Sequence, residues 1–436
     1  MDINNEENIK IIKELDDLEL ILDSIMDMSA NERIAKMFNS YRSQQRNEKM
    51  KRKCSCPDCN NISILHSHTI PKSCSLINIH EDKKVLEPEH SVRTYIKDKM
   101  LIEMNLKGIE TEATTFPGFC KKHEEFFSDF EISGKITNDV HYAKQCFRGL
   151  CKDIFLREVE KEHLEKELKE YKKERNKRVK EYLNKKECFS GSKKIDNITI
   201  EASDIYTRQI CHLIEKMDSD ISKLTPYRDK LYRISKNESS FGQEGLMYCT
   251  CPCSILLPVA LSGYTFINLE GNDDSSLFYM NIVPLQDKTI IYCVIEKRDY
   301  NKLKPWFDRL ENIFFLLSAV EEFMIYGTNE WCIKPSVWRA IPKSRQEYIL
   351  SEICSNKSIK FSYIELSIFD EIRKTVIEAA QKVVSEDNID ENKKIELRKW
   401  IEFEEKKLKY NPCISLSEKE QKMQEELEKF FQHRKV

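Results

Sequence analysis

Two pairs of metal-ligand residues, far apart in the sequence, constrain this chain more than any other feature. Cys56 and Cys59 are separated by two residues, and so are Cys120 and His123. The first spacing is that of a zinc knuckle, whose tight turn directs two thiolates at one ion. The second spacing puts a thiolate and an imidazole on one face of a first helical turn. Together the two pairs predict one structural zinc site in a treble-clef module.

A third cysteine beside the first pair leaves one ligand open. The segment 54–59 reads CSCPDC, so Cys54 is a rival to Cys56. Two intervening residues are the usual spacing in a knuckle, and this favours Cys56. The alternative to a metal site is a set of unrelated buried cysteines. Two half-sites flanking a histidine-rich strand make that alternative the weaker one.

The N-terminal segment and the cysteine content also favour a metal over disulfides. The chain has 16 cysteines, and its opening, MDINNEENIKIIKELDDLELIL, is acidic and lacks the apolar core of a secretion signal. Since no run of about 18 apolar residues occurs, we expect a cytoplasmic protein with no membrane contact. Thiols stay reduced in that compartment, so clustered cysteines indicate metal binding.

Composition predicts a mainly helical α+β protein with several domains. A chain of 436 residues is too long for one compact core, and its low content of 10 glycines favours long helices. The net charge of −3 excludes a polycation, so any contact with nucleic acid must come from a local patch. The segment 42–53, RSQQRNEKMKRK, is the candidate patch, and a solvated helix end is its alternative interpretation.

Hydrophobic periodicity divides the chain into four parts. Apolar residues at helical spacing precede the cysteines, and a long, largely charged helical pattern follows them. Short β-rich runs such as LFYMNIVPL and TIIYCVIEK then predict a small antiparallel sheet packed with helices. We expect N-terminal helices (1–48), a zinc module (49–135), a helical hairpin or coiled-coil arm (136–240) and an α+β C-terminal domain (241–436).

Two further features carry secondary hypotheses. The arm, with helices expected at 138–187 and 200–235, is a candidate surface for a protein partner or a second copy of the chain. Cys249, Cys251 and Cys253 alternate, so on a strand they would share one face and could bind metal. Because no partner pair stands nearby, an ordinary core strand is the favoured interpretation.

The zinc motif resembles the HNH endonuclease superfamily, whose module is a ββα-metal treble clef. In that family a knuckle precedes a strand that ends in a histidine and a nearby proline, as in His68-Thr69-Ile70-Pro71 here. The second half-site is followed by a phenylalanine-rich helix, as in Cys120-Lys-Lys-His123-Glu-Glu-Phe-Phe. The resemblance covers residues 50–130. The whole chain also resembles a class of bacterial proteins that share the segments SHTIPKS, TFPGFC-x-x-H and IKPSVW.

The HNH resemblance implies roles for two more residues. His68 matches the general base, which deprotonates the attacking water. Glu124 stands where the family has a final histidine, a ligand of the catalytic ion, and a carboxylate suits Mg²⁺. The family's middle asparagine has no match in ATTFPG, which leaves catalysis open. A purely structural histidine, hydrogen-bonded within the module, is the alternative for His68.

These features together predict a zinc-stabilised, HNH-like protein that binds nucleic acid. The resemblance implies DNA as the nucleic acid, Mg²⁺-dependent endonuclease activity and a role in antiviral defence against foreign DNA. The alternative is a catalytically inactive zinc scaffold that assembles through its helical arm. No phosphate-binding G-x-x-x-x-G-K-[ST] loop, G-x-G-x-x-G or G-x-S-x-G motif occurs, so nucleotide hydrolysis, dinucleotide chemistry and serine hydrolysis have no support.

Overall fold

The computed structural model describes most of the chain as two compact units. The first unit comprises residues 1–74, 90–101 and 110–246, and the second comprises 75–89, 102–109 and 247–436. Most of the predicted basic segment 42–53 lies outside the described residues. The described residues are 9–12, 15–26, 33, 52–96, 99–187, 197–269, 275–355, 357–386 and 389–412.

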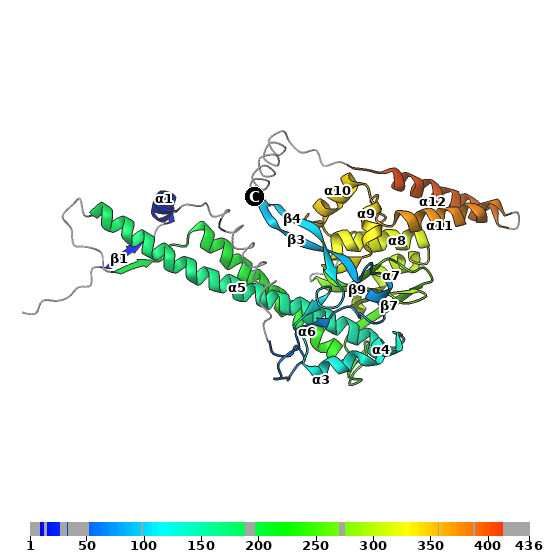
Figure 1. The fold of residues 1–436 in the computed structure, drawn as a ribbon, viewed down its shortest axis with the longest axis horizontal. Helices are drawn as coiled ribbons and strands as arrows, with labels where there is room; N and C mark the ends of the chain where they lie inside the picture. The colour runs from blue at the N-terminus through cyan, green and yellow to red at the C-terminus, as the bar shows by residue number, and fades with distance from the viewer. Residues whose placement is uncertain are drawn as a thin grey trace, which may run out of the picture. The chain divides into compact units, whose positions relative to one another are not determined.

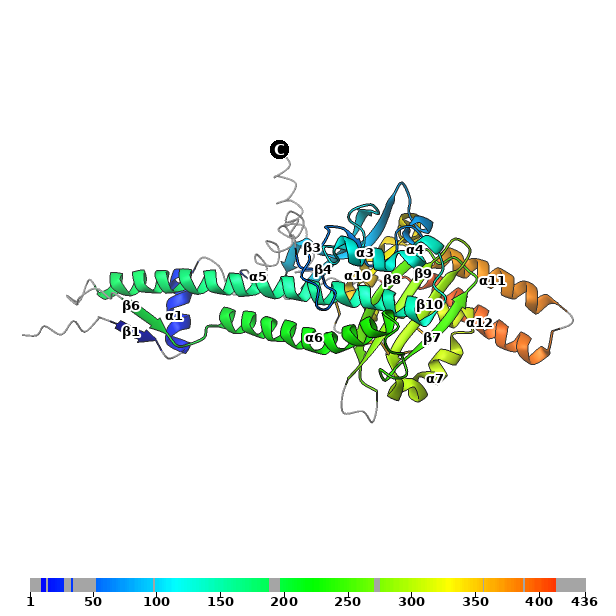
Figure 2. The same ribbon diagram turned by 90° about the horizontal axis from the view of Figure 1, so that it is seen from below.

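The first unit contains the predicted helical arm. Helices α5 (Asp139–Glu187) and α6 (Ile205–Ser235) run side by side in opposite directions (Figures 1 and 2). Their seam is the thin apolar stripe of the sequence, and it includes the fully buried Ile210. At the start of α6, Asp204 caps the helix by accepting from Thr207 N–H at 2.8 Å.

The N-terminal segment is less helical than the sequence predicts. Strand β1 (Ile9–Ile12) precedes helix α1 (Leu15–Ile25) and pairs in parallel with β6 (Asn197–Ile200). The prediction of helix throughout residues 1–48 is therefore wrong at β1. Its isoleucines suit a strand, and the distant β6 supplies a partner that local periodicity does not reveal.

The predicted zinc module contains a two-stranded ladder followed by short helices. Strand β2 (Ser67–His68) pairs antiparallel with β5 (Thr115–Phe116), and helix α3 (Lys121–Glu124) follows. A 3₁₀ turn, η2 (Glu125–Phe127), then leads into α4 (Ser128–Ser133). Buried aromatic rings join this module to α5, with the ring centroids of Phe119 and Phe147 5.9 Å apart.

The second unit is built on a seven-stranded sheet with the order β4-β3-β11-β8-β9-β10-β7. Its central strands β8, β9 and β10 pair antiparallel. Strands β3 and β4, which lie within the predicted zinc module, join this sheet, and β3 pairs with β11 at Leu86 and Ile333. The strands are β3 (Lys84–Ile96), β4 (Lys99–Gly108), β7 (Leu246–Cys253), β8 (Val259–Ile267), β9 (Ser276–Pro284), β10 (Thr289–Glu296) and β11 (Trp331–Ile333).

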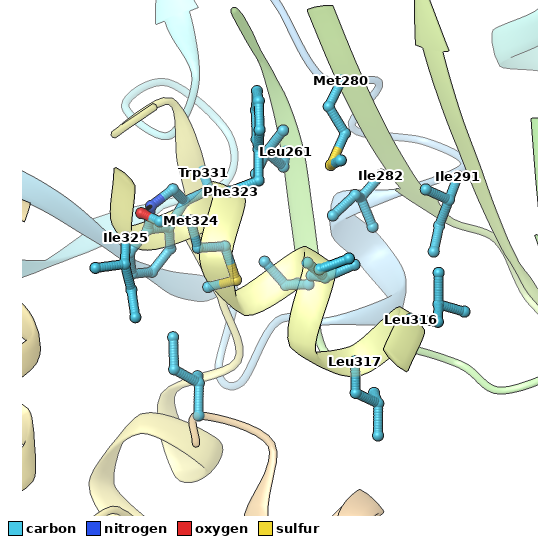
Figure 3. Close-up of a cluster of buried hydrophobic side chains, with 14 of the residues drawn as sticks. Leu261, Met280, Ile282, Ile291, Leu316, Leu317, Phe323, Met324, Ile325 and Trp331 are labelled. Carbon is cyan, nitrogen blue, oxygen red and sulfur yellow. Dashed lines mark hydrogen bonds between the residues drawn. The ribbon is translucent and has the colours of Figure 1, made fainter. Parts of the chain in front are cut away.

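Helices of the second unit pack on this sheet around a hydrophobic core (Figure 3). Trp331 is buried there, and its indole N–H donates to the carbonyl of Met324 at 2.9 Å. The α+β class predicted from the sequence is therefore confirmed. The helices are α7 (Tyr300–Arg309), α8 (Ile313–Glu322), the π-helical turn η4 (Phe323–Gly327), α9 (Pro335–Ala340), α10 (Lys343–Ile353), α11 (Asp370–Ser385) and α12 (Glu391–Lys409).

Four charged side chains are buried where α8, α11 and α12 meet, and we call them the ionic cluster. Arg373 donates to Glu321 at 2.7 Å and also pairs with Glu404. Lys407 completes the cluster at 2.7 Å from Glu321. Burial alone would raise the pKa of Glu321, but Arg373 and Lys407 hold it below its usual value. The cluster therefore holds α11 and α12 against α8 through paired charges.

Among the described residues, no helix has the length and apolar composition that crossing a membrane requires.

Candidate zinc centre and histidine site

A tight turn shapes the first half of the zinc centre. Asp58 adopts a left-handed conformation, with φ of 61°, and the N–H of Cys59 donates to the carbonyl of Cys56 at 3.2 Å. Before this turn, Cys54 N–H donates to the carbonyl of Asn61 at 2.9 Å. The loop therefore folds back on itself, and its hydrogen bonds bring Cys54 and Cys59 to the same side of the loop.

The second half of the centre is the start of helix α3. Cys120 occupies the N-cap position, and His123 N–H donates to its carbonyl at 2.9 Å. The side chains of these two residues point the same way, with 3.5 Å between the Cys120 Sγ and His123 Nδ1 atoms. The predicted helical turn thus brings the predicted pair together.

Four ligand atoms converge from the two halves. Those of Cys54, Cys59, Cys120 and His123 all lie within 4.8 Å of one another. The Cys59 and Cys120 sulfurs are 4.0 Å apart, and the Cys54 sulfur is 3.2 Å from His123 Nδ1. Three thiols and one imidazole are a ligand set typical of structural zinc, so the residues fit the metal.

The structure places Cys54 in this group instead of the predicted Cys56. Cys56 is the first residue of the tight turn, where its carbonyl accepts from Cys59, and its buried side chain is hydrogen-bonded to Cys54 and lies outside the converging group. The assignment of Cys56 from its spacing is corrected for this reason. The other three predicted ligands are brought together, and the rival considered from the sequence completes the set.

Cys56 still contributes to the centre through Cys54. A hydrogen bond from the Cys56 thiol is the largest influence on Cys54 and lowers its pKa to about 4. The same hydrogen bond and burial raise the pKa of Cys56 far above its ordinary value. The Cys56 thiol is therefore placed to donate to the Cys54 sulfur, an arrangement that stabilises a metal-bound thiolate.

His68, the predicted general base, is held in one orientation. The ring donates to the main-chain carbonyl of Glu110, which leaves Nδ1 buried and without a hydrogen-bond partner among the described residues. Burial, together with the nearby cations Arg148 and Lys72, lowers the pKa of His68 to about 4. The ring is consequently neutral at pH 7 and presents a free lone pair on Nδ1.

Glu124, the other predicted catalytic residue, lies beside Ser67, the residue before His68. Its carboxylate is hydrogen-bonded to the Ser67 side chain, and its Oε2 is buried with no partner in the described part of the chain. Burial raises the pKa of Glu124. Within the described residues no hydrogen bond joins Glu124 to His68. Glu124 on α3 therefore contacts Ser67, the residue before His68 on β2, and not His68 itself.

Three residues beside His68 were not predicted from the sequence. Gln145 and Arg148 lie on α5, and Glu131 lies on α4. Arg148 is fully buried, and its guanidinium donates to Glu131 at 2.6 Å. A single arginine in a helix has no spacing signal, so only the packing of α5 on the module reveals it.

A cavity of about 690 Å³ lies between the first cysteine loop and α5. Arg52 and Lys53, the described end of the predicted basic patch, line it together with Arg228 from α6. The cavity is mixed in charge, because Arg52 donates to both carboxylate oxygens of Glu162 at 2.6 Å. Three cations in one cavity wall are compatible with phosphate contacts, although two glutamates share that wall.

Within the described residues, the second group of cysteines gathers no set of potential metal ligands. Cys249, Cys251 and Cys253 lie on β7, and the cluster around Cys54 is the sole group of three or more potential metal ligands among the described residues. Burial raises the pKa of Cys249 and of Cys251 to about 11, so these thiols stay protonated. The core-strand interpretation of this segment fits the structure.

Comparison with models of known families, with curated proteins and with solved structures finds no match to this chain.

Proposed function

We propose that the first unit is a zinc-stabilised, HNH-like module that binds nucleic acid and hydrolyses phosphodiester bonds with His68 as the general base. One observation carries this proposal. His68 is a neutral imidazole whose tautomer is fixed by Glu110 and whose Nδ1 lone pair has no partner among the described residues. A histidine that served only to hold the module together would be expected to use both ring nitrogens.

The order of elements supports the comparison with HNH nucleases. The candidate base ends strand β2, a second strand pairs with it, and a short helix follows that carries Cys120 and His123 at its start. In the proposal, zinc fixes this arrangement and takes no part in the reaction. The described cations of the cavity wall, Arg52, Lys53 and Arg228, would contact substrate phosphates.

A carboxylate beside β2 suits a second, hard cation. Oε2 of Glu124 is buried without a partner among the described residues. Mg²⁺ prefers such ligands, and it would stabilise the negative charge on the leaving oxygen. His68 would accept the proton of the attacking water. We further propose DNA as the substrate, with defence against foreign DNA as the role.

The test is metal-dependent cleavage of plasmid and single-stranded DNA by the full chain. Without a base the chemical step slows, so His68→Ala is expected to lower the cleavage rate by about 10²–10⁴-fold. Zinc content and DNA affinity should stay unchanged, because phosphate neutralisation does not involve the base. Cleavage rate, bound zinc and DNA binding are measured on the same preparations.

His66→Ala is the matched control, because His66 precedes the same strand by one residue and no role is proposed for it. It should cleave like the unaltered chain. Equal cleavage by His68→Ala would exclude His68 as the base. DNA binding without cleavage at any divalent ion tested would favour the alternative, an inactive zinc scaffold that assembles through its arm.

A further inference from the structure

The N-terminal part of α5 contacts the end of the strand that carries His68. Gln145 Nε2 donates to the carbonyl of Thr69, the residue after His68, at 2.6 Å. Arg148, one turn further along α5, donates to Gln145 at 3.4 Å and to Glu131 at 2.6 Å. A chain of hydrogen bonds therefore links the backbone next to His68 to both α5 and α4.

Arg148 is a costly residue to bury. Its side chain is 0% exposed, and its guanidinium lies 4.5 Å from the centre of the Phe127 ring and 5.5 Å from that of Phe130. One carboxylate neutralises it, and its Nε has no hydrogen-bond partner among the described residues. A helix needs no buried arginine to pack on an aromatic cluster, since an apolar side chain would serve at lower cost.

We propose that Arg148 is a positioning residue for His68: together with Gln145 it fixes the strand end that carries the imidazole, and its guanidinium keeps a cation beside the ring. The proposal rests on His68 being the base of the proposed reaction. Helix α5 lies outside the resemblance to HNH nucleases, and through Arg148 and Gln145 it takes part in that site. Full burial keeps Arg148 away from substrate, so it acts through His68.

The charges that face His68 come from three elements. Arg148 on α5 and Lys72 after β2 favour the neutral ring, whereas Glu131 on α4 favours the charged ring. The carbonyl of Glu110 accepts from the ring and also favours the charged form. Removal of Arg148 takes away a cation and leaves Glu131 without its partner. Both changes act in the same direction, toward protonation of His68.

The experiment follows His68 directly by NMR in the full chain carrying ¹³C- and ¹⁵N-labelled histidine, with His68→Ala to assign the signal. In Arg148→Met the pKa of His68 should rise from about 4 by roughly one unit or more, the size of effect that one nearby charge produces. In the profile of cleavage rate against pH, the acid limb should move to higher pH by the same amount. Arg148→Lys, which keeps a cation, should restore most of both values.

Two further variants keep the test decisive if Arg148→Met does not fold. Glu131→Gln removes the opposite charge, so the pKa of His68 should fall. Gln145→Leu breaks the hydrogen bond to Thr69 without a change of charge, so kcat should fall while KM and the acid limb stay in place. Arg157→Met is the control, because Arg157 lies further along α5 and pairs with Asp220 of α6.

The titration of His68 separates this inference from the proposed function. Unchanged titration in folded, zinc-containing Arg148→Met, or a shift of the wrong sign in Glu131→Gln, would overturn the role of Arg148 whether or not the chain cleaves DNA. The expected shifts in a chain that cleaves no DNA would support the positioning of His68 and overturn only the nuclease.

Discussion

Substitution of Cys54 by serine is expected to release the zinc and to unfold the module around it. The four ligand atoms lie within 4.8 Å of one another, so a single ion joins two segments whose cysteines Cys59 and Cys120 are 61 positions apart. A structural zinc site contributes about 10–16 kcal/mol in small zinc-dependent domains, a large part of which depends on each thiolate. Metal content by mass spectrometry should fall from about one zinc per chain to a small fraction of that value.

Cys56→Ser is the matched control, because it makes the same chemical change two residues away. It should keep the zinc, and because a serine hydroxyl can also donate to the Cys54 sulfur, a chelator should remove the metal about as slowly as from the unaltered chain. Thermal unfolding of both variants, with and without added zinc, measures the stability. Zinc retained in Cys54→Ser but lost in Cys56→Ser would restore the assignment based on spacing.

Arg373→Met should destabilise the second unit by about 3–5 kcal/mol, since it leaves buried carboxylates without their main partner. Arg373, Glu321 and Glu404 are all 0% exposed, so water cannot replace the lost charge. Methionine fills a similar volume, which keeps the contribution of an empty cavity small. Chemical denaturation followed by tryptophan fluorescence should report the loss, because Trp331 and Trp306 lie in the same unit.

The control for this prediction is Arg398→Met on α12. Arg398 pairs with Glu391 at 3.0 Å, but the two side chains are 53% and 65% exposed. A solvated pair of this kind contributes only about 0–1 kcal/mol. An equal loss in both variants would show that the ionic cluster has no special role in holding α11 and α12.

The zinc centre shows how far spacing alone predicts a site. Cys59, Cys120 and His123 come together as predicted because a turn and a helix start impose local geometry that a spacing encodes. The choice between Cys54 and Cys56 depends on which residue begins the turn, and the left-handed Asp58 decides it. Such a conformation is several-fold enriched in aspartate, but the sequence does not require it here.

Long-range pairing explains most of what the sequence did not predict in the fold. The helices of the arm follow from a periodic apolar stripe and were predicted to within a few residues. Strands β3 and β4 were missed because their charged segment, HSVRTYIKDKMLIEMNLKG, has no strong alternation and its partner β11 lies far along the chain. The ionic cluster was missed because Glu321 stands in an apolar run, and its partners come from two later helices.

The insertion of β3 and β4 between the two halves of the zinc centre has a consequence for synthesis on the ribosome. Both zinc half-sites, and the two strands between them, emerge early, so the metal can close its loop while most of the second unit is still untranslated. Strand β3 can pair with β4 at once, but its other edge, at Leu86, can pair with Ile333 only after β11 has been synthesised. An unpaired strand edge can bind wrong partners during that interval. Early capture of zinc would tether the waiting strands in a short loop and so limit the partners within their reach.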